Sequence, residues 1–89
     1  MLTRRVGRTD LTVSRLGLGT MTWAQAQIST VIGLLKRFWE VGGSLIDTAA
    51  AYGGGEVESL IGRLIGHTIR RQDLVLATKS GYIWRDGRR

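Results

Sequence analysis

The chain has 89 residues, of which 13 are Lys or Arg and 7 are Asp or Glu, so its formal net charge is +6. It contains no cysteine and a single histidine, which excludes a disulfide scaffold, a cysteine-based zinc site and a metal centre with two histidines. The composition is that of a globular protein, and no apolar run reaches the roughly 20 residues that span a membrane.

The first elements predicted are a hairpin and a short strand. Two short segments on either side of the turn at residues 7–10 predict a β-hairpin over residues 3–14. Three apolar residues would share one face of this hairpin: Val6, Leu11 and Val13. Residues 15–20 then predict a buried strand that ends in glycines.

A helix is predicted next, over about residues 29–41. Its apolar residues recur at helical spacing, namely Val31, Leu34, Leu35 and Phe38. Ser29 or Thr30 is the expected N-cap, and the glycine pair Gly42-Gly43 is expected to end the helix.

The rest of the chain predicts a strand, a second helix and another strand. The strands cover residues 44–47 and 73–79, and the helix covers about residues 56–65. Acidic residues stand in the first turn of this helix, where the helix dipole favours them. Residues 80–89 are polar and predict irregular structure.

This order predicts an α/β fold in which an N-terminal hairpin is followed by a β-α-β-α-β unit with a parallel sheet. Such a sheet is normally covered on both faces or closed into a barrel, which needs far more chain. We therefore expect these residues to be the front part of a larger fold, with an independent three-stranded domain as the alternative. Four helix residues are expected to lack packing partners in the isolated chain: Val31, Leu35, Val57 and Leu60.

Three chemically useful side chains follow the predicted strands. Asp47 ends the second strand of the parallel sheet, Tyr52 lies in the loop after it, and Lys79 ends the third strand. The carboxyl ends of adjacent parallel strands share one rim, so we expect these groups to meet. A phenol with a pKa near 10 is a weak acid at neutral pH, and a neighbouring ammonium lowers a phenol's pKa. Such a set suits a general acid that protonates a carbonyl oxygen. Each residue alone is better explained by a structural contact, and only the three together favour a functional site.

At this point the sequence resembles the aldo-keto reductases. The resemblance rests on the hairpin region and on four further segments: GLGTMTW at 17–23, LIDTAAAYG at 45–53, ESLIG at 58–62 and LATK at 76–79. It implies the first part of a (β/α)8 TIM barrel, incomplete in this chain, and reduction of aldehydes or ketones by hydride transfer from NADPH. Residues 1–89 would form the N-terminal portion of that barrel.

The resemblance also implies roles for individual residues. Tyr52 matches the proton donor, Lys79 the lysine that activates it, and Asp47 the partner of that lysine. Thr20, Met21 and Asp47 match positions at the nicotinamide end of the cofactor site, and Trp23 matches a position near the substrate. No metal site is implied.

The chain also departs from the family pattern. The family's catalytic histidine follows a fourth strand, which the predicted elements do not include, and His67 is expected to be a solvated loop residue. The isolated chain is therefore expected to be inactive, with a non-catalytic remnant or an interaction module as the alternative. A small carbonyl compound is the expected substrate of the full-length protein, and specific nucleic-acid or membrane binding is not expected. The N-terminus lacks the apolar stretch of a secretory signal, so a cytoplasmic location is expected.

Overall fold

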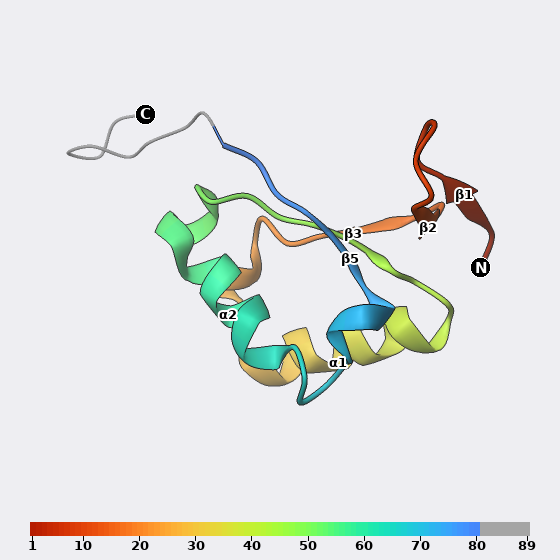
Figure 1. Ribbon diagram of the computed structural model, residues 1–89. Coiled ribbons are helices and arrows are strands. Elements are labelled where there is room, and N and C mark those ends of the chain that lie inside the picture. The colour runs from red at the N-terminus through yellow and green to blue at the C-terminus, as the bar shows by residue number, and fades with distance from the viewer. Residues whose placement is uncertain (81–89) are drawn as a thin grey trace.

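The computed structural model describes residues 1–80, so the irregular segment expected over residues 80–89 lies outside this range except for its first residue (Figure 1). Two α-helices and five strands make up the main elements of these residues, and three short 3₁₀ turns lie between them. In chain order these are β1 (Thr3–Arg5), β2 (Thr12–Ser14), β3 (Gly17–Gly19), α1 (Ile28–Glu40), β4 (Leu45–Asp47), α2 (Glu56–Leu64) and β5 (Val75–Ala77). The element order is the predicted one, and each helix begins and ends within one residue of its expected bounds.

The predicted hairpin is present, but most of its apolar side chains lie outside the core. β1 and β2 pair antiparallel, with Arg4 opposite Val13. Of the three apolar residues expected on one face, only Val13 is buried, while Val6 and Leu11 are exposed. The reason is position, because the hairpin lies at the amino end of the parallel strands, away from α2 (Figure 1).

Ser14 and Ser44 connect the hairpin to the parallel sheet. The backbone N–H of Ser14 donates to Ser44 Oγ at 2.9 Å, and the backbone N–H of Ser44 donates to Ser14 Oγ at 3.0 Å. Ser14 is almost fully buried. This reciprocal pair holds the end of the hairpin against the residue that precedes β4.

β3, β4 and β5 form the predicted parallel sheet, in that order. In register, Leu18 pairs with Ile46, and Ile46 pairs with Leu76. One residue later, Gly19 and Ala77 flank Asp47. The strands are shorter than the apolar runs suggested, and the carboxyl ends of all three lie at the same rim.

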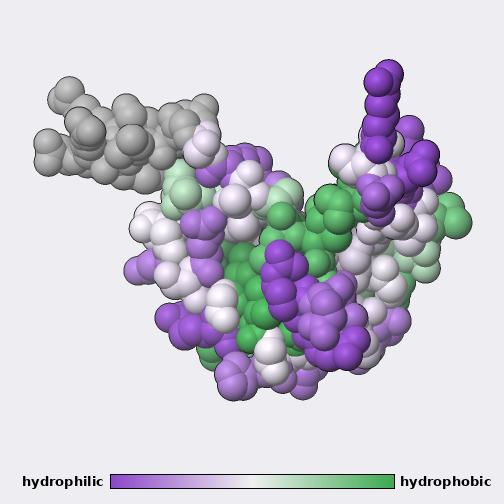
Figure 2. Space-filling view, viewed as in Figure 1, coloured by the Kyte–Doolittle hydropathy of each residue, from purple (hydrophilic) through white to green (hydrophobic). Residues whose placement is uncertain are grey.

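Both helices pack on one face of this sheet (Figure 1). The core between them centres on fully buried Ile46 and contains ten residues: Trp23, Val31, Leu35, Ile46, Val57, Leu60, Ile61, Leu64, Ile69 and Leu74. Hydrophobic residues gather in the middle of the face shown in Figure 2, between the hairpin and α2. None of the helices in residues 1–80 has the length and apolar character needed to cross a bilayer.

Several packing expectations were wrong. Four residues expected to lack partners are buried in this core, because α1 and α2 pack their apolar faces against the same strands: Val31, Leu35, Val57 and Leu60. Leu34 lies on the exposed side of α1, where no element of residues 1–80 covers it.

The N-cap of α1 is Gln27 rather than Ser29 or Thr30, since the helix begins one residue early and Gln27 adopts an extended backbone.

The glycine pair ends α1 as predicted. Gly42 adopts a φ of +89°, and its N–H donates to the carbonyl of Trp39 at 3.0 Å. The N–H of Gly43 donates to the carbonyl of Phe38 at 2.8 Å. These two bonds form a Schellman motif, which turns the chain sharply toward β4.

Replacing Gly43 by Ala is expected to destabilise the fold by about 1–3 kcal/mol. A Cβ at this position would overlap the ring of Phe38, which is itself packed against the core. The matched control is Gly33→Ala inside α1, where a Cβ meets nothing within 4 Å. That change is expected to stabilise the protein by up to about 1 kcal/mol through helix propensity. Urea unfolding of both variants measures the difference, and equal effects would contradict the packing described for Gly43.

Candidate functional site

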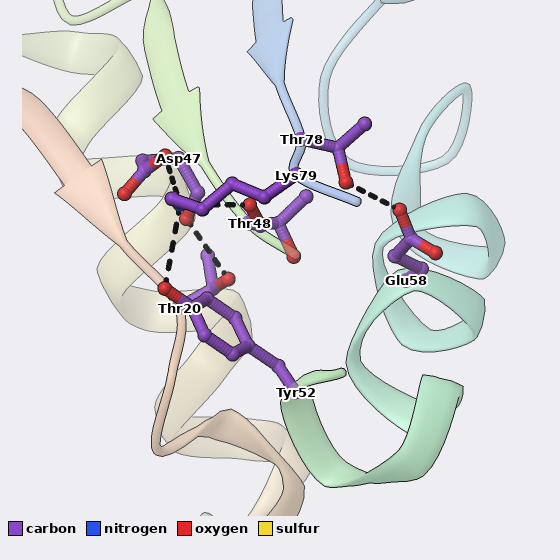
Figure 3. Close-up of polar contacts among 7 residues, drawn as sticks. All are labelled: Thr20, Asp47, Thr48, Tyr52, Glu58, Thr78 and Lys79. Atoms are coloured by element: carbon purple, nitrogen blue, oxygen red, sulfur yellow. Dashed lines mark hydrogen bonds and ion pairs between the residues drawn. The ribbon is translucent and has the colours of Figure 1, made fainter. Parts of the chain in front are cut away.

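The end of β5 directs neighbouring side chains to opposite faces of the sheet. Successive residues of a strand alternate between faces. Thr78 points to α2, where its hydroxyl donates to Glu58 Oε2 at 2.7 Å, and Lys79 points to the face that the helices leave open (Figure 3). Asp47 lies on that same open face, since its neighbour Ile46 is buried under the helices.

Lys79 is the centre of a polar cluster on this rim. Its Nζ donates to Asp47 Oδ1 at 2.7 Å, to the carbonyl oxygen of Thr48 at 3.0 Å and to the phenolic oxygen of Tyr52 at 3.4 Å (Figure 3). The ammonium also lies 5.2 Å from the centre of the Tyr52 ring. The structure thus brings together the three residues selected from the sequence, Asp47, Tyr52 and Lys79.

Tyr52 lies at the start of a tight turn that requires positive φ angles. It opens a 3₁₀ turn, Tyr52–Gly55, in which Gly53 and Gly54 have φ values of +58° and +65°. A Cβ on Gly53 would lie 2.6 Å from the Cβ of Ala24, so this turn packs directly on the neighbouring 3₁₀ turn, Trp23–Gln25. This contact gives Gly53 a structural reason, because only glycine combines that φ with so close an approach.

The charge pair between Lys79 and Asp47 is half exposed, with side-chain exposures of 50% and 46%. The hydrogen bond to Asp47 raises the pKa of Lys79 above its ordinary value of 10.5, and the bond to Tyr52 acts in the same direction. An exposed pair contributes little to stability because water screens it. Its main effect is to keep Lys79 protonated and oriented toward the phenol.

Folding stability is expected to fall in the alkaline range because of this pair. The pKa of Lys79 is higher in the folded than in the unfolded chain, so the stabilisation is fully present below the ordinary lysine pKa. It is lost as the pH rises through the raised pKa of Lys79. Urea midpoints measured across this range should fall less steeply for Lys79→Met than for the wild type. Lys36→Met is the control, because Lys36 is the chain's only other lysine, and an unchanged slope in Lys79→Met would contradict the expectation.

The cofactor and substrate candidates occupy different surroundings. Thr20 is fully buried, and its hydroxyl donates to the backbone carbonyl of Asp47 at 3.0 Å, which joins the ends of β3 and β4. Met21 is 67% exposed beside it. Trp23 is buried in the core rather than grouped with the Lys79 cluster. Trp23 also lines a hollow of about 630 Å³ beside α2, which none of Asp47, Tyr52 and Lys79 lines.

Further observations concern His67, metal binding and two contacts that were not predicted. His67 is exposed after α2, as expected. Within residues 1–80, no group of three His, Cys, Asp or Glu side chains is arranged to hold a metal ion. The sequence reasoning missed the Thr78–Glu58 bond and the Thr48 carbonyl that accepts from Lys79. Strand alternation next to Lys79 was the signal that could have shown Thr78 facing α2.

Comparison with known proteins places these residues in a family context. The sequence profile of the aldo/keto reductase family matches residues 15–88. Among curated proteins, the chain is 37% identical over 87 residues to the uncharacterized oxidoreductase YqkF of Bacillus subtilis, covering 98% of this chain and 28% of that protein. It is 34% identical over 86 residues to the aldo-keto reductase YhdN of the same organism, covering 91% of this chain and 26% of YhdN.

Solved structures of aldo-keto reductases also match this chain. The holo form of the aldo-keto reductase AKR11C1 from Bacillus halodurans matches with a TM-score of 0.82 and 36% sequence identity. The match covers 99% of this chain and 28% of that protein. The chain therefore spans less than a third of the length of these relatives.

Proposed function

The chain belongs to the aldo/keto reductase family, and on this premise we propose that it supplies the proton-donating rim of an NADPH-dependent carbonyl reductase. One observation carries the proposal, namely that Lys79 Nζ contacts both Asp47 Oδ1 and the Tyr52 phenol. The substrate would be a small aldehyde or ketone. The match covers 28% of YqkF and 26% of YhdN, so the rest of such a barrel would come from residues outside the match.

Each of the three side chains has a distinct task in this proposal. Tyr52 donates its phenolic proton to the carbonyl oxygen as that oxygen gains negative charge. Lys79, held at 3.4 Å from the phenol, stabilises the phenolate that remains. Asp47 accepts from Lys79 at 2.7 Å and keeps the ammonium charged and directed toward Tyr52. The carbonyl thus becomes an alcohol once hydride and proton are both added.

We propose that residues at the rim would hold the nicotinamide end of NADPH. When bound, NADPH would supply the hydride for this reaction. Asp47 and Met21 present exposed side chains on the rim. Thr20 holds the backbone at Asp47, because its hydroxyl donates to the Asp47 carbonyl. We propose Asp47 and Met21 as cofactor contacts, Thr20 as the residue that holds the Asp47 backbone in place, and Trp23 as a residue near the substrate.

A chimera tests the proposed function directly. Residues 1–89 replace the matching N-terminal part of YhdN, and a second chimera uses AKR11C1 as the host. Carbonyl-dependent oxidation of NADPH, with p-nitrobenzaldehyde as the probe, is expected in a chimera whose circular dichroism shows a folded barrel. A folded chimera that binds NADPH but has no turnover would overturn the proposal. That result would favour the alternative, a non-catalytic remnant or interaction module.

The isolated chain is proposed to be catalytically inactive. The described residues supply the proton-donating groups but only one end of the cofactor site. Fixed positions for cofactor and substrate can contribute up to about 7–11 kcal/mol to catalysis, and the isolated chain lacks most of them. The same assay on the isolated chain measures this, and carbonyl-dependent NADPH oxidation above the buffer rate would contradict it.

A further inference from the structure

We infer that Glu58 of α2 is a positioning residue, which holds Thr78 so that its neighbour Lys79 reaches Asp47 and Tyr52. The inference rests on the proposed role of Lys79. Glu58 touches neither the phenol nor the Lys79 ammonium in the structure. Its effect would pass through Thr78, whose hydroxyl donates to Glu58 Oε2 at 2.7 Å.

The first argument concerns where the sheet ends. The paired part of β5 stops at Ala77. Beyond it, the backbone N–H of Thr48 donates to the Ala77 carbonyl at 2.8 Å, but the next bond, from Ala50 to the Lys79 carbonyl, is long at 3.4 Å. The Thr78–Glu58 bond is therefore the short contact that fastens the chain immediately before Lys79.

The second argument concerns direction. Thr78 and Lys79 point to opposite sides of the chain, one toward α2 and one across the rim (Figure 3). Fixing the Thr78 side chain to the helix therefore fixes the backbone from which Lys79 extends. Lys79 Nζ lies at the end of a four-carbon chain and only 3.4 Å from the phenol. A backbone shift of about 1 Å is enough to break such a contact, and misplacement of that size costs up to about 10²-fold in rate.

The third argument concerns Glu58 itself. It stands in the first turn of α2, as does Glu56, so both acids complement the helix dipole. Glu56 is exposed, whereas Glu58 is partly buried and faces β5. Glu58 and Thr78 also line a small hollow of about 170 Å³ with buried Thr48, whose backbone carbonyl accepts from Lys79. A general dipole role would not distinguish the two acids, but the bond to Thr78 does.

Titration of Lys79 in the 89-residue chain tests this inference without any enzyme assay. The chain has two lysines, so side-chain NMR gives two lysine Cε signals, and Lys36 is the internal reference. Thr78→Val removes the hydroxyl without changing charge, and Glu58→Ala removes the acceptor. Both are expected to move the Lys79 midpoint down toward the ordinary lysine value, because Lys79 then loses its contact with Asp47.

Conservative variants separate positioning from charge. Glu58→Gln keeps an acceptor oxygen and Thr78→Ser keeps the hydroxyl, so both should preserve the Lys79 midpoint. Glu56→Gln removes a charge from the same helical turn and should also leave it unchanged. A midpoint that falls equally in Glu58→Gln and Glu58→Ala would mean that charge alone acts, and would overturn the inference. So would Lys79 and Lys36 signals that respond identically in every variant.

The YhdN chimera adds a second readout. Thr78→Val is expected to lower kcat by about 10-fold to 10²-fold while the KM for NADPH stays the same, and Thr78→Ser should restore kcat. If the chimera has no activity but the Lys79 midpoint depends on Thr78, the proposed function fails and the inference stands. If the chimera is active but the Lys79 midpoint does not depend on Thr78, the inference fails and the proposed function stands.

Discussion

Tyr52→Phe in the YhdN chimera is expected to lower kcat for carbonyl reduction by about 10²–10⁴-fold, the usual contribution of a positioned general acid. The change removes one oxygen and keeps the ring. The ring therefore retains its place 5.2 Å from the Lys79 ammonium and its packing against the core. Steady-state kinetics with p-nitrobenzaldehyde and fluorescence titration with NADPH measure the two effects separately.

Cofactor binding is the internal control for this variant. Because Tyr52→Phe leaves Asp47 and Met21 in place, the Kd for NADPH should remain within about twofold of the unsubstituted chimera. A kcat within twofold of that chimera would mean that another group donates the proton. A parallel loss of NADPH binding would mean that Tyr52 acts mainly in shaping the site.

Leu35→Ala is expected to destabilise the chain by about 2–5 kcal/mol, because it leaves a cavity between α1 and the sheet. Leu35 is 2% exposed and belongs to the central core. The free energy of unfolding of an ordinary domain is only about 5–15 kcal/mol, so this single change is expected to remove a large share of it. Urea unfolding followed by circular dichroism measures the loss.

The neighbouring leucine is a matched control. Leu34 lies on the same helix and is 48% exposed. Leu34→Ala makes the same chemical change and is expected to shift stability by no more than about 0.5 kcal/mol. Similar losses for the two variants would show that α1 does not pack as the structure has it.

Local patterns in the sequence determined much of the fold. The spacing of apolar residues predicted α1 and α2 within one residue of their observed bounds. Apolar residues recur at helical spacing only as far as the helix extends, because they form the face that it buries. Glycines at positions 42 and 43 predicted the end of α1, since the turn there requires a positive φ. Strands alternating with helices implied a parallel sheet, and a parallel sheet places the ends of β4 and β5 at one rim.

The candidate site followed from the same logic, up to a limit. Asp47 and Lys79 were expected to meet because they end adjacent predicted strands. In the structure, Lys79 Nζ lies 2.7 Å from Asp47 Oδ1. The sequence alone did not reveal the bond from Thr78 to Glu58, or the burial of the Thr20 hydroxyl against Asp47. The first contact joins residues that are 20 positions apart in the sequence, and the second joins residues that are 27 positions apart. The periodicity of a single helix or strand therefore does not predict either contact.

Which apolar residues share the core was likewise decided only by tertiary structure. Leu34 and Leu35 fit the same helical pattern, yet one is exposed and the other buried. Val6 and Leu11 are exposed because the hairpin lies at the amino end of the parallel strands rather than over a face of the sheet. Periodicity specifies that an element has an apolar face, but burial depends on which other elements reach that face. That information resides in the packing of α1 and α2 on β3, β4 and β5.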